Sequence, residues 1–299
     1  MVKKGVKILN LSGAATKIAG LAGAAYYLSN EYGYRPNIIT GISSGAILTI
    51  PIAMRKWETI NYLVKNFGLS DIFDKPPVNE QNKVRLRAYF RAAIGKSSFG
   101  TQGNLPKTLS KVITEDDWHR YQCGDYPECY IGSVDFKTGA RHIVNLKDKG
   151  VTYERYLMLV NASASIPLAV EPVRLDGKLL YDGGTRNHIL GAWAIKNFED
   201  IKESISIYAR PKDYYGLVDS KWTDGNLINV FERYTNISMI EISKRDEREE
   251  SILANIENVD VKQIFIPSVI KDLYDTDTNK MNILYDLAYS EAEKIINYG

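Results

Sequence analysis

The chain has 299 residues, which is long enough for one large domain or two small ones. Its composition, 44% hydrophobic and 25% charged, is that of an ordinary soluble globular protein. Lysine and arginine total 38 against 36 acidic residues, and the formal net charge of +2 argues against nucleic acid as the main partner.

The N-terminal segment has only a superficial likeness to a secretion signal. Lys3 and Lys4 precede an apolar stretch, but Lys7 and Lys17 interrupt it, and no apolar run reaches the roughly 18 residues that span a bilayer. We therefore expect a soluble, cytoplasmic protein without a transmembrane segment.

Strand and helix patterns alternate at the start of the chain. VKILNL (6–11) is an apolar run typical of a buried strand, and the small apolar residues after it predict a helix that ends at Gly33. PNIIT (36–40) predicts a second strand. A second helix is expected over 45–68, in which Pro51 would force a kink or a break.

Alternation returns towards the C-terminus. Strand patterns cover 129–136, 141–146, 205–211 and 261–267, and helix patterns cover 152–164, 226–256 and 279–298. No repeat, linker or low-complexity tract marks a boundary, so a single domain over 1–299 is the simplest account. These patterns predict an α/β fold, with helices on the faces of a sheet.

GISSG (41–45) lies between the second predicted strand and the second predicted helix. The spacing G-x-S-x-G is typical of a nucleophile elbow, a sharp strand-to-helix turn that exposes a serine hydroxyl. It selects Ser43, flanked by Gly41 and Gly45, and leaves Ser44 to contribute a backbone N–H to an oxyanion. The same letters also fit an ordinary tight turn, because glycine and serine are common turn residues.

Histidines do not complete a triad in the α/β-hydrolase order of serine, acid and late histidine, because none follows His188. His119 lies in the polar segment DDWHR and is expected at the surface. His142 alternates within a predicted strand and is expected to be structural, and His188 is expected to be a loop residue. The two cysteines, Cys123 and Cys129, have no second pair nearby, so neither a disulfide framework nor a metal site is expected.

LLYDGGTRNH (179–188) places a carboxylate, Asp182, between an apolar segment and two glycines, Gly183 and Gly184. One interpretation is the D-G turn of a hairpin. The other is an active-site carboxylate that takes the proton of Ser43 directly, in a two-residue arrangement without imidazole. Because an aspartate in water is a poor base, that arrangement requires Asp182 to be shielded from water and held close to Ser43.

Four stretches, in order, resemble the patatin-like phospholipases, or lipid acyl hydrolases. LNLSGAATKIAG (9–20) is similar to the family's glycine-rich oxyanion loop, and GISSG is similar to its nucleophile elbow. NASASIPLAVEPV (161–173) is similar to its A-S-x-x-x-P segment, and YDGGTRN (181–187) to its D-G-G/A motif. The resemblance implies a three-layer fold with a central, mostly parallel sheet flanked by helices.

It also implies a Ser43/Asp182 dyad that forms an acyl-enzyme on Ser43, with no metal and no other cofactor. The oxyanion would be held by backbone N–H groups around Gly13, Ala14 and Ala15, with Lys17 at the basic position beside the loop. The loop departs from the family pattern, because Ala14, Ala15 and Ile18 stand where the family has glycines. Alanine does not readily adopt a positive φ, so such a backbone would strain or reshape the hole. The loop is neither a P-loop nor a dinucleotide fingerprint.

The family's substrates imply a lipid partner at a membrane surface, and therefore peripheral membrane association. NKVRLRAYFRAAIGKSS (82–98) interleaves basic with apolar residues and fits an anionic membrane surface or a solvated helix face. Its members of interest are Lys83, Arg85, Arg87, Arg91 and Lys96, with Val84, Leu86, Tyr89 and Phe90.

Two functions remain open on the sequence. One is a serine acyl hydrolase that cleaves acyl esters of phospholipids or related lipids. The alternative is a patatin-fold protein with weak or no catalysis that acts as a lipid- or partner-binding module.

Overall fold

An eight-stranded sheet forms the centre of the protein, for which a computed structural model describes residues 5–66, 68–79, 85–213, 227–270 and 275–298. Five strands are parallel, in the order β3 (Glu128–Asp135), β2 (Ile38–Ile42), β1 (Val6–Leu11), β7 (Ile201–Tyr208) and β8 (Asp260–Phe265). The middle strand β2 is buried throughout and β1 is buried from Ile8 onwards, as their mainly apolar sequences predict.

The other three strands extend the sheet in antiparallel pairing beyond β3. They are β4 (Ala140–Asn145), which pairs with β3, β6 (Lys178–Asp182), which also pairs with β3, and β5 (Val173–Leu175), which pairs with β6. Strand β4 pairs with one edge of β3 from Tyr130 to Asp135. Strands β2 and β6 therefore share the opposite edge.

On that shared edge β2 and β6 run towards each other. Strand β2 is parallel to β3 and ends with Ile42 opposite Gly132, whereas β6 is antiparallel and ends with Asp182 opposite Ser133. Because Gly132 and Ser133 are neighbours, the carboxyl ends of the two strands meet. This meeting point positions the site described below.

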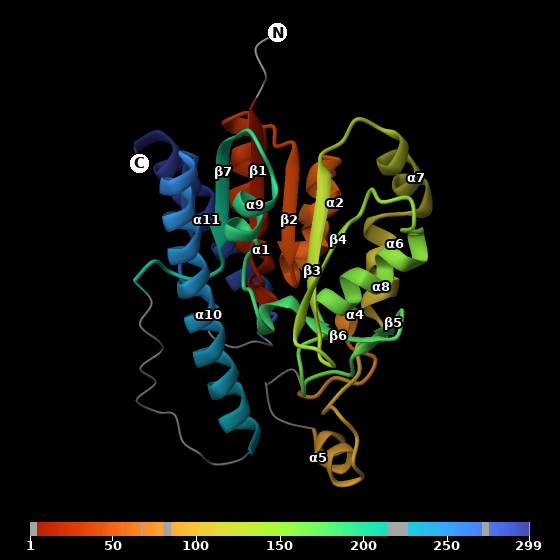
Figure 1. Ribbon diagram of the computed structural model, residues 1–299. Coiled ribbons are helices and arrows are strands. Elements are labelled where there is room, and N and C mark those ends of the chain that lie inside the picture. Colours follow the sequence, from red (N-terminus) through yellow and green to blue (C-terminus); the bar gives the residue numbers. More distant parts are fainter. Residues whose placement is uncertain (1–4, 67, 80–84, 214–226, 271–274, 299) are drawn as a thin grey trace.

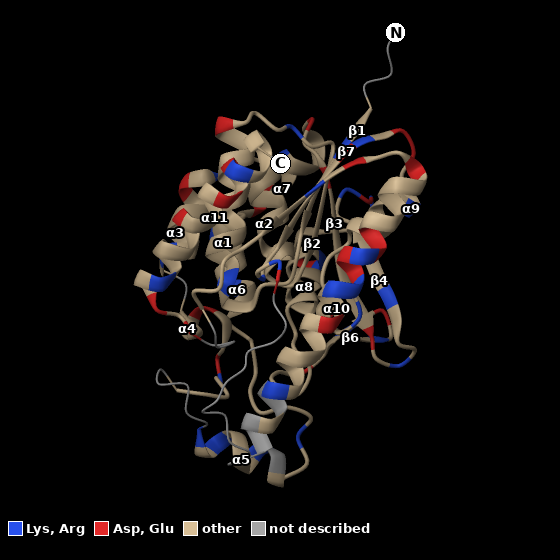
Figure 2. Cartoon of the chain, turned by 90° about the vertical axis from the view of Figure 1, so that its left-hand side faces the viewer, with Lys and Arg blue, Asp and Glu red and all other residues tan. Residues whose placement is uncertain are grey.

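Helices cover both faces of the sheet, which gives three layers (Figure 2). One face carries most of the core, packed against α1 (Ile18–Tyr26), α2 (Ser44–Ala53), α3 (Trp57–Asn66), α6 (Leu105–Val112), α7 (Glu115–Cys123), α8 (Tyr153–Ser163) and α11 (Thr278–Tyr298). The other face carries α9 (Gly191–Asn197) and the long α10 (Leu227–Glu257). Two further helices, α4 (Leu69–Ile72) and α5 (Leu86–Ala93), lie at the end towards which β1 and β2 run (Figure 1).

The predicted α/β class is confirmed, and each strand and long helix expected from the sequence has a counterpart. The helix expected over 45–68 is divided into α2 and α3, but the division does not fall at Pro51, which lies inside α2. The break falls at Arg55, whose φ is 56°. No helix in the described ranges combines the length and apolarity needed to cross a membrane.

Candidate active site

Ser43 forms the apex of the turn between β2 and α2, with φ 54° and ψ −120°. A residue other than glycine is strained in this region of φ and ψ, so its backbone must be held by its surroundings. The N–H of Ser43 donates to Ser163 Oγ at 2.9 Å, and that hydroxyl donates to the carbonyl of Gly132 at 2.6 Å. Ser163 thus ties the elbow to β3.

Both glycines of the elbow are required by close backbone approach. A Cβ on Gly41 would lie 2.6 Å from the carbonyl of Gly45, and a Cβ on Gly45 would lie 2.5 Å from the carbonyl of Leu11. Any larger residue would push β1, β2 and α2 apart. The pattern that selects Ser43 is therefore a steric requirement of this turn.

Asp182 ends β6 and begins a short 3₁₀ turn over Gly183–Thr185, so it does not lie in the hairpin turn that we considered from the sequence. Its backbone N–H donates to Ser165 O at 2.8 Å, and its Oδ1 accepts from the N–H of Gly184 at 2.7 Å. Burial raises the pKa of Asp182 to about 6, although hydrogen bonds from Ser43 and Gly184 oppose the shift. A carboxylate with this pKa next to a hydroxyl is suited to accept its proton near neutral pH.

The loop after β1 presents N–H groups to the same place, but not all three that the resemblance implies. The N–H of Gly13 donates to the carbonyl of His188 at 2.8 Å and is not free for an oxyanion. In the described part of the chain, the N–H groups of Ala14 and Ala15 have no acceptor, and neither has the N–H of Ser44 at the start of α2. Ala14, Ala15 and Ser44 are therefore the candidate donors.

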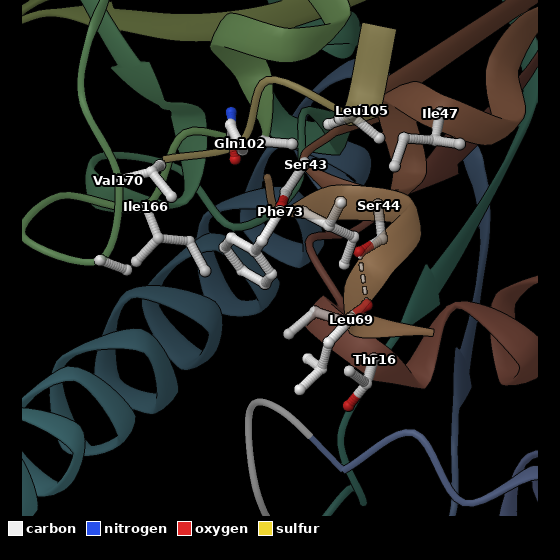
Figure 3. Close-up of a pocket in the computed structure, with 14 residues that line it drawn as sticks. Thr16, Ser43, Ser44, Ile47, Leu69, Phe73, Gln102, Leu105, Ile166 and Val170 are labelled. Carbon is white, nitrogen blue, oxygen red and sulfur yellow. Dashed lines mark hydrogen bonds between the residues drawn. The ribbon is translucent and has the colours of Figure 1, made fainter. Parts of the chain in front are cut away.

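Ala15 adopts φ 47°, whereas Ala14 adopts φ −141°. The strain that the missing glycines imply is thus concentrated at Ala15. Its carbonyl is held by Ser44 Oγ, which donates to it at 2.7 Å (Figure 3). The second serine of GISSG therefore contributes its side chain to the loop, a role that the sequence did not suggest.

An apolar pocket opens beside Ser43, Ser44 and Ala15 (Figure 3). Gln102 is among its polar members and is held by Ser165 Oγ at 2.6 Å and by Asn161 O at 2.8 Å. The apolar lining is provided by Ile47, Leu69, Ile72, Phe73, Leu105, Ile166, Ala169 and Val170. Such a lining suits a hydrocarbon chain attached to a group that reacts at Ser43.

Lys17 is half-buried beside the loop, and burial lowers its pKa. Gly183 packs so tightly that a Cβ there would lie 2.6 Å from Gly132 O. His188 is a loop residue, as expected, and its ring lies near Ser43. His142 on β4 contacts Ser133 of β3, and His119 is exposed, as expected. Within the described ranges, no three His, Cys, Asp or Glu residues gather as metal ligands would. Both cysteines are free, Cys123 exposed and Cys129 buried.

Two groups essential to this geometry were not identified from the sequence. Ser163 lies within the A-S-x-x-x-P segment, which was matched without a role for its serine. Asp246 of α10 accepts from the backbone N–H of His188 at 2.6 Å and from Asn187 Nδ2 at 3.0 Å. No local pattern could have revealed it, because α10 is distant in the chain.

Comparisons with known proteins bear on the family and on the fold. The sequence model of the family described as "Patatin-like phospholipase" matches residues 9–193. Among solved structures, VipD from Legionella pneumophila has a TM-score of 0.51 at 12% identity, over 98% of this chain and 67% of VipD. That likeness concerns the fold alone.

The complex ExoU–SpcU from the type III secretion system of Pseudomonas aeruginosa matches with a TM-score of 0.28 and 15% identity. The match covers 85% of this chain and about half, 52%, of the other chain. A TM-score this low does not establish a common fold. No curated protein matches the sequence.

Replacing Asp182 by Asn removes a buried carboxylate whose ionised form is disfavoured. The pKa of this carboxyl is near 3.8 in the unfolded chain and about 6 in the folded protein, so between pH 3.8 and pH 6 the folded state binds more protons than the unfolded state. The free energy of unfolding of the wild type therefore falls as pH rises through this range. We expect Asp182→Asn to raise the free energy of unfolding by up to about 3 kcal/mol at pH 8 and by little at pH 4. Urea denaturation measures both; an equal gain at the two pH values would contradict the burial argument.

Replacing Ala15 by Gly relieves the positive φ of the loop. The left-handed conformation costs alanine about 1–2 kcal/mol, part of which the greater freedom of unfolded glycine offsets. We expect Ala15→Gly to stabilise the fold by about 0.5–1 kcal/mol. Ala14→Gly, at a position where φ is negative, is the matched control and should lose stability. Equal effects at the two positions would refute strain from the positive φ of Ala15.

Proposed function

This chain belongs to the patatin-like phospholipase family, and we propose that it is a serine acyl hydrolase that cleaves acyl esters of phospholipids or related lipids. Family membership supports a lipid hydrolase in general. One observation of the structure carries the finer proposal, namely that the ends of β2 and β6 bring Ser43 against a buried Asp182.

In the proposed reaction, Ser43 Oγ attacks the acyl carbon of the ester while its proton passes to Asp182. The carbonyl oxygen becomes an oxyanion, which accepts hydrogen bonds from the N–H groups of Ala14, Ala15 and Ser44. The bond to the alcohol then breaks, and the alcohol oxygen takes the proton from Asp182. Water attacks the acyl-enzyme in the same way, giving its proton to Asp182, which returns it to Ser43.

The apolar pocket beside Ser43 supports a lipid substrate. Among the described residues, its lining, from Ile47 and Leu105 to Ile166 and Val170, includes no charged side chain that could bind a polar acyl substituent. An alkyl chain seated there gains about 0.8 kcal/mol for each methylene removed from water. The acyl chain of the ester would occupy this pocket, and its alcohol would project away from it.

Hydrolysis of a p-nitrophenyl ester and of a labelled phospholipid, with EDTA present, tests the dyad. We expect wild type to be active, and Ser43→Ala and Asp182→Asn each to lose on the order of 10³-fold or more. Because the base must be ionised, kcat/KM should fall as pH drops through about 6, the pKa of Asp182. Activity that persists in Ser43→Ala would exclude this nucleophile.

One observation favours the alternative of a binding module, namely the strained Ala15 in the oxyanion loop. A fluorophosphonate probe separates the two functions, because it labels only an activated serine. Labelling of wild type and not of Ser43→Ala supports the hydrolase. A wild type that binds lipid vesicles yet is neither labelled nor hydrolytic would instead support the binding module.

We further propose that α5 docks this enzyme on an anionic lipid surface. Leu86 is 85% exposed and Phe90 63% exposed. Arg87 is exposed on the same helix, which carries no acidic residue. Figures 1 and 2 place α5 at one end of the molecule. An apolar and basic face of this kind suits an anionic membrane interface.

Arg91 is not part of that surface, contrary to what the sequence suggested. It is buried, with its NH2 group 2.7 Å from Glu171 Oε1 and its Nε donating to Ser98 O. Ser98 bridges to Leu168, next to pocket residues Ala169 and Val170. Arg91 therefore anchors α5 beside the pocket rather than reaching the lipid. Lys83 and Val84 lie outside the described residues.

The double variant Leu86→Asp, Phe90→Asp tests this docking. In co-sedimentation with vesicles that contain phosphatidylserine, we expect its affinity for the vesicles to fall at least about tenfold, because it loses two apolar anchors and gains negative charge. Hydrolysis of the soluble p-nitrophenyl ester should be unchanged. The control is Ile256→Asp, because the Ile256 side chain is 69% exposed and lies near the C-terminal end of α10. Unaltered vesicle binding by the double variant would overturn the role of α5.

A further inference from the structure

His188 lies beside the reacting serine, although the reaction above does not use it. Its side chain is only 6% exposed. The ring atoms Nε2 and Cδ2 lie 3.5 and 3.6 Å from the point that a Cβ on Gly13 would occupy, and Ser43 Cβ lies 3.6 Å from the same point. The imidazole and the nucleophilic residue therefore both border the space that a side chain on Gly13 would fill.

The backbone of His188 is held from two sides. Its carbonyl accepts from Gly13, and its N–H donates to Asp246 Oδ2 at 2.6 Å. Asp246 Oδ1 also holds the side chain of Asn187, whose Oδ1 accepts from Arg141. The position of the ring is thus determined by α10 and by the oxyanion loop.

The ring nitrogen Nδ1, in contrast, has no partner in the described part of the chain, where it is fully buried and makes no hydrogen bond. The other ring nitrogen, Nε2, lies 3.5 Å from the point that a Cβ on Gly13 would occupy. A buried polar atom without a partner costs free energy and needs an explanation. Nδ1 therefore fits the role of an acceptor that is left without a donor, and Nε2, on the side of the ring near Ser43, can have the substrate as its partner.

The protonation of the ring follows from its surroundings. Burial and the charges of Arg210 and Lys17 lower the pKa of His188 to about 3, so the ring is neutral when Asp182 is ionised. A neutral imidazole carries one N–H. A proton on Nδ1 would be a buried orphan donor, which is rarer in proteins than an orphan acceptor. The favoured tautomer therefore has its N–H at Nε2.

The acyl pocket lies on another side of Ser43. Ala15, Ser43 and Ser44 line that pocket, whereas Gly13 and His188 do not. With the acyl chain in the pocket and the oxyanion on the loop N–H groups, the alcohol part of the ester is directed to the remaining side. His188, which lies near Ser43 and does not line the acyl pocket, is the side chain that we assign to that side.

We propose that His188 is a catalytic residue whose Nε2–H donates a hydrogen bond to the alcohol oxygen of the scissile ester. As the C–O bond breaks, negative charge grows on this oxygen, and the hydrogen bond stabilises it until Asp182 delivers the proton. His188 itself neither gains nor loses a proton. The inference rests on the proposed acyl hydrolysis and adds one member to its site.

The test compares kcat/KM, which reports acylation, for two butyrate esters in His188→Leu and His188→Gln. A p-nitrophenolate leaving group is weakly basic and needs little stabilisation, whereas an alkoxide from a glycerol ester needs much. We expect His188→Leu to lose about 10- to 100-fold on the glycerol ester and less than about threefold on the p-nitrophenyl ester. The amide of Gln can donate in place of Nε2, so His188→Gln should recover part of the loss.

Gly13→Ala provides a second variant that does not alter the buried histidine. Its methyl group would meet His188 and Ser43 at ordinary contact distances and shield Nε2 from the alcohol oxygen. We expect the same leaving-group-dependent loss. Equal losses on both esters in the two variants, or no loss in either, would overturn the role of His188, whereas a wild type that cleaves neither ester would refute the proposed hydrolase itself.

Discussion

The site depends on one property of the sheet, which is that two strands share a single edge of β3 from opposite directions. Strand β2 uses the edge up to Gly132 and β6 uses it from Ser133, so each strand must end where the other does. Backbone hydrogen bonds of the sheet, rather than side-chain contacts, therefore bring Ser43 to Asp182. Ser163 reinforces the same point, because one hydroxyl binds both the elbow and the carbonyl of Gly132.

Three features of the site are unfavourable for the folded chain, and each is held by its surroundings. Ser43 and Ala15 have positive φ, and Asp182 is a carboxylate buried away from water. The elbow is fixed by Ser163 and the loop by Ser44, while Asp182 is fixed by the backbone on both sides. The polar side chains around the site thus stabilise a geometry that the backbone alone would relax.

Local patterns predicted the elements that periodicity and motif spacing encode. The parallel strands, the long helices and the GISSG turn were expected, and Asp182 was singled out by its glycines. Strands β5 and β6 were not identified, because they are short and only partly buried at their starts. No local pattern could predict three other features, because each depends on residues far apart in the chain. They are the hydrogen bond that occupies the Gly13 N–H, the burial of Arg91 and the contact of Asp246 with His188.

The pairing of β6 also determines where this protein tolerates changes of chain length. Only three residues of β6 pair with β3, and side chains alternate between faces along a strand. Deleting or inserting one residue within β6 would turn the carboxylate of Asp182 to the opposite face of the sheet, away from Ser43. The β5–β6 turn, whose Asp176 and Gly177 are exposed, is free of that constraint. Among related sequences, gaps should therefore gather in this turn and be absent from the few residues before the acid.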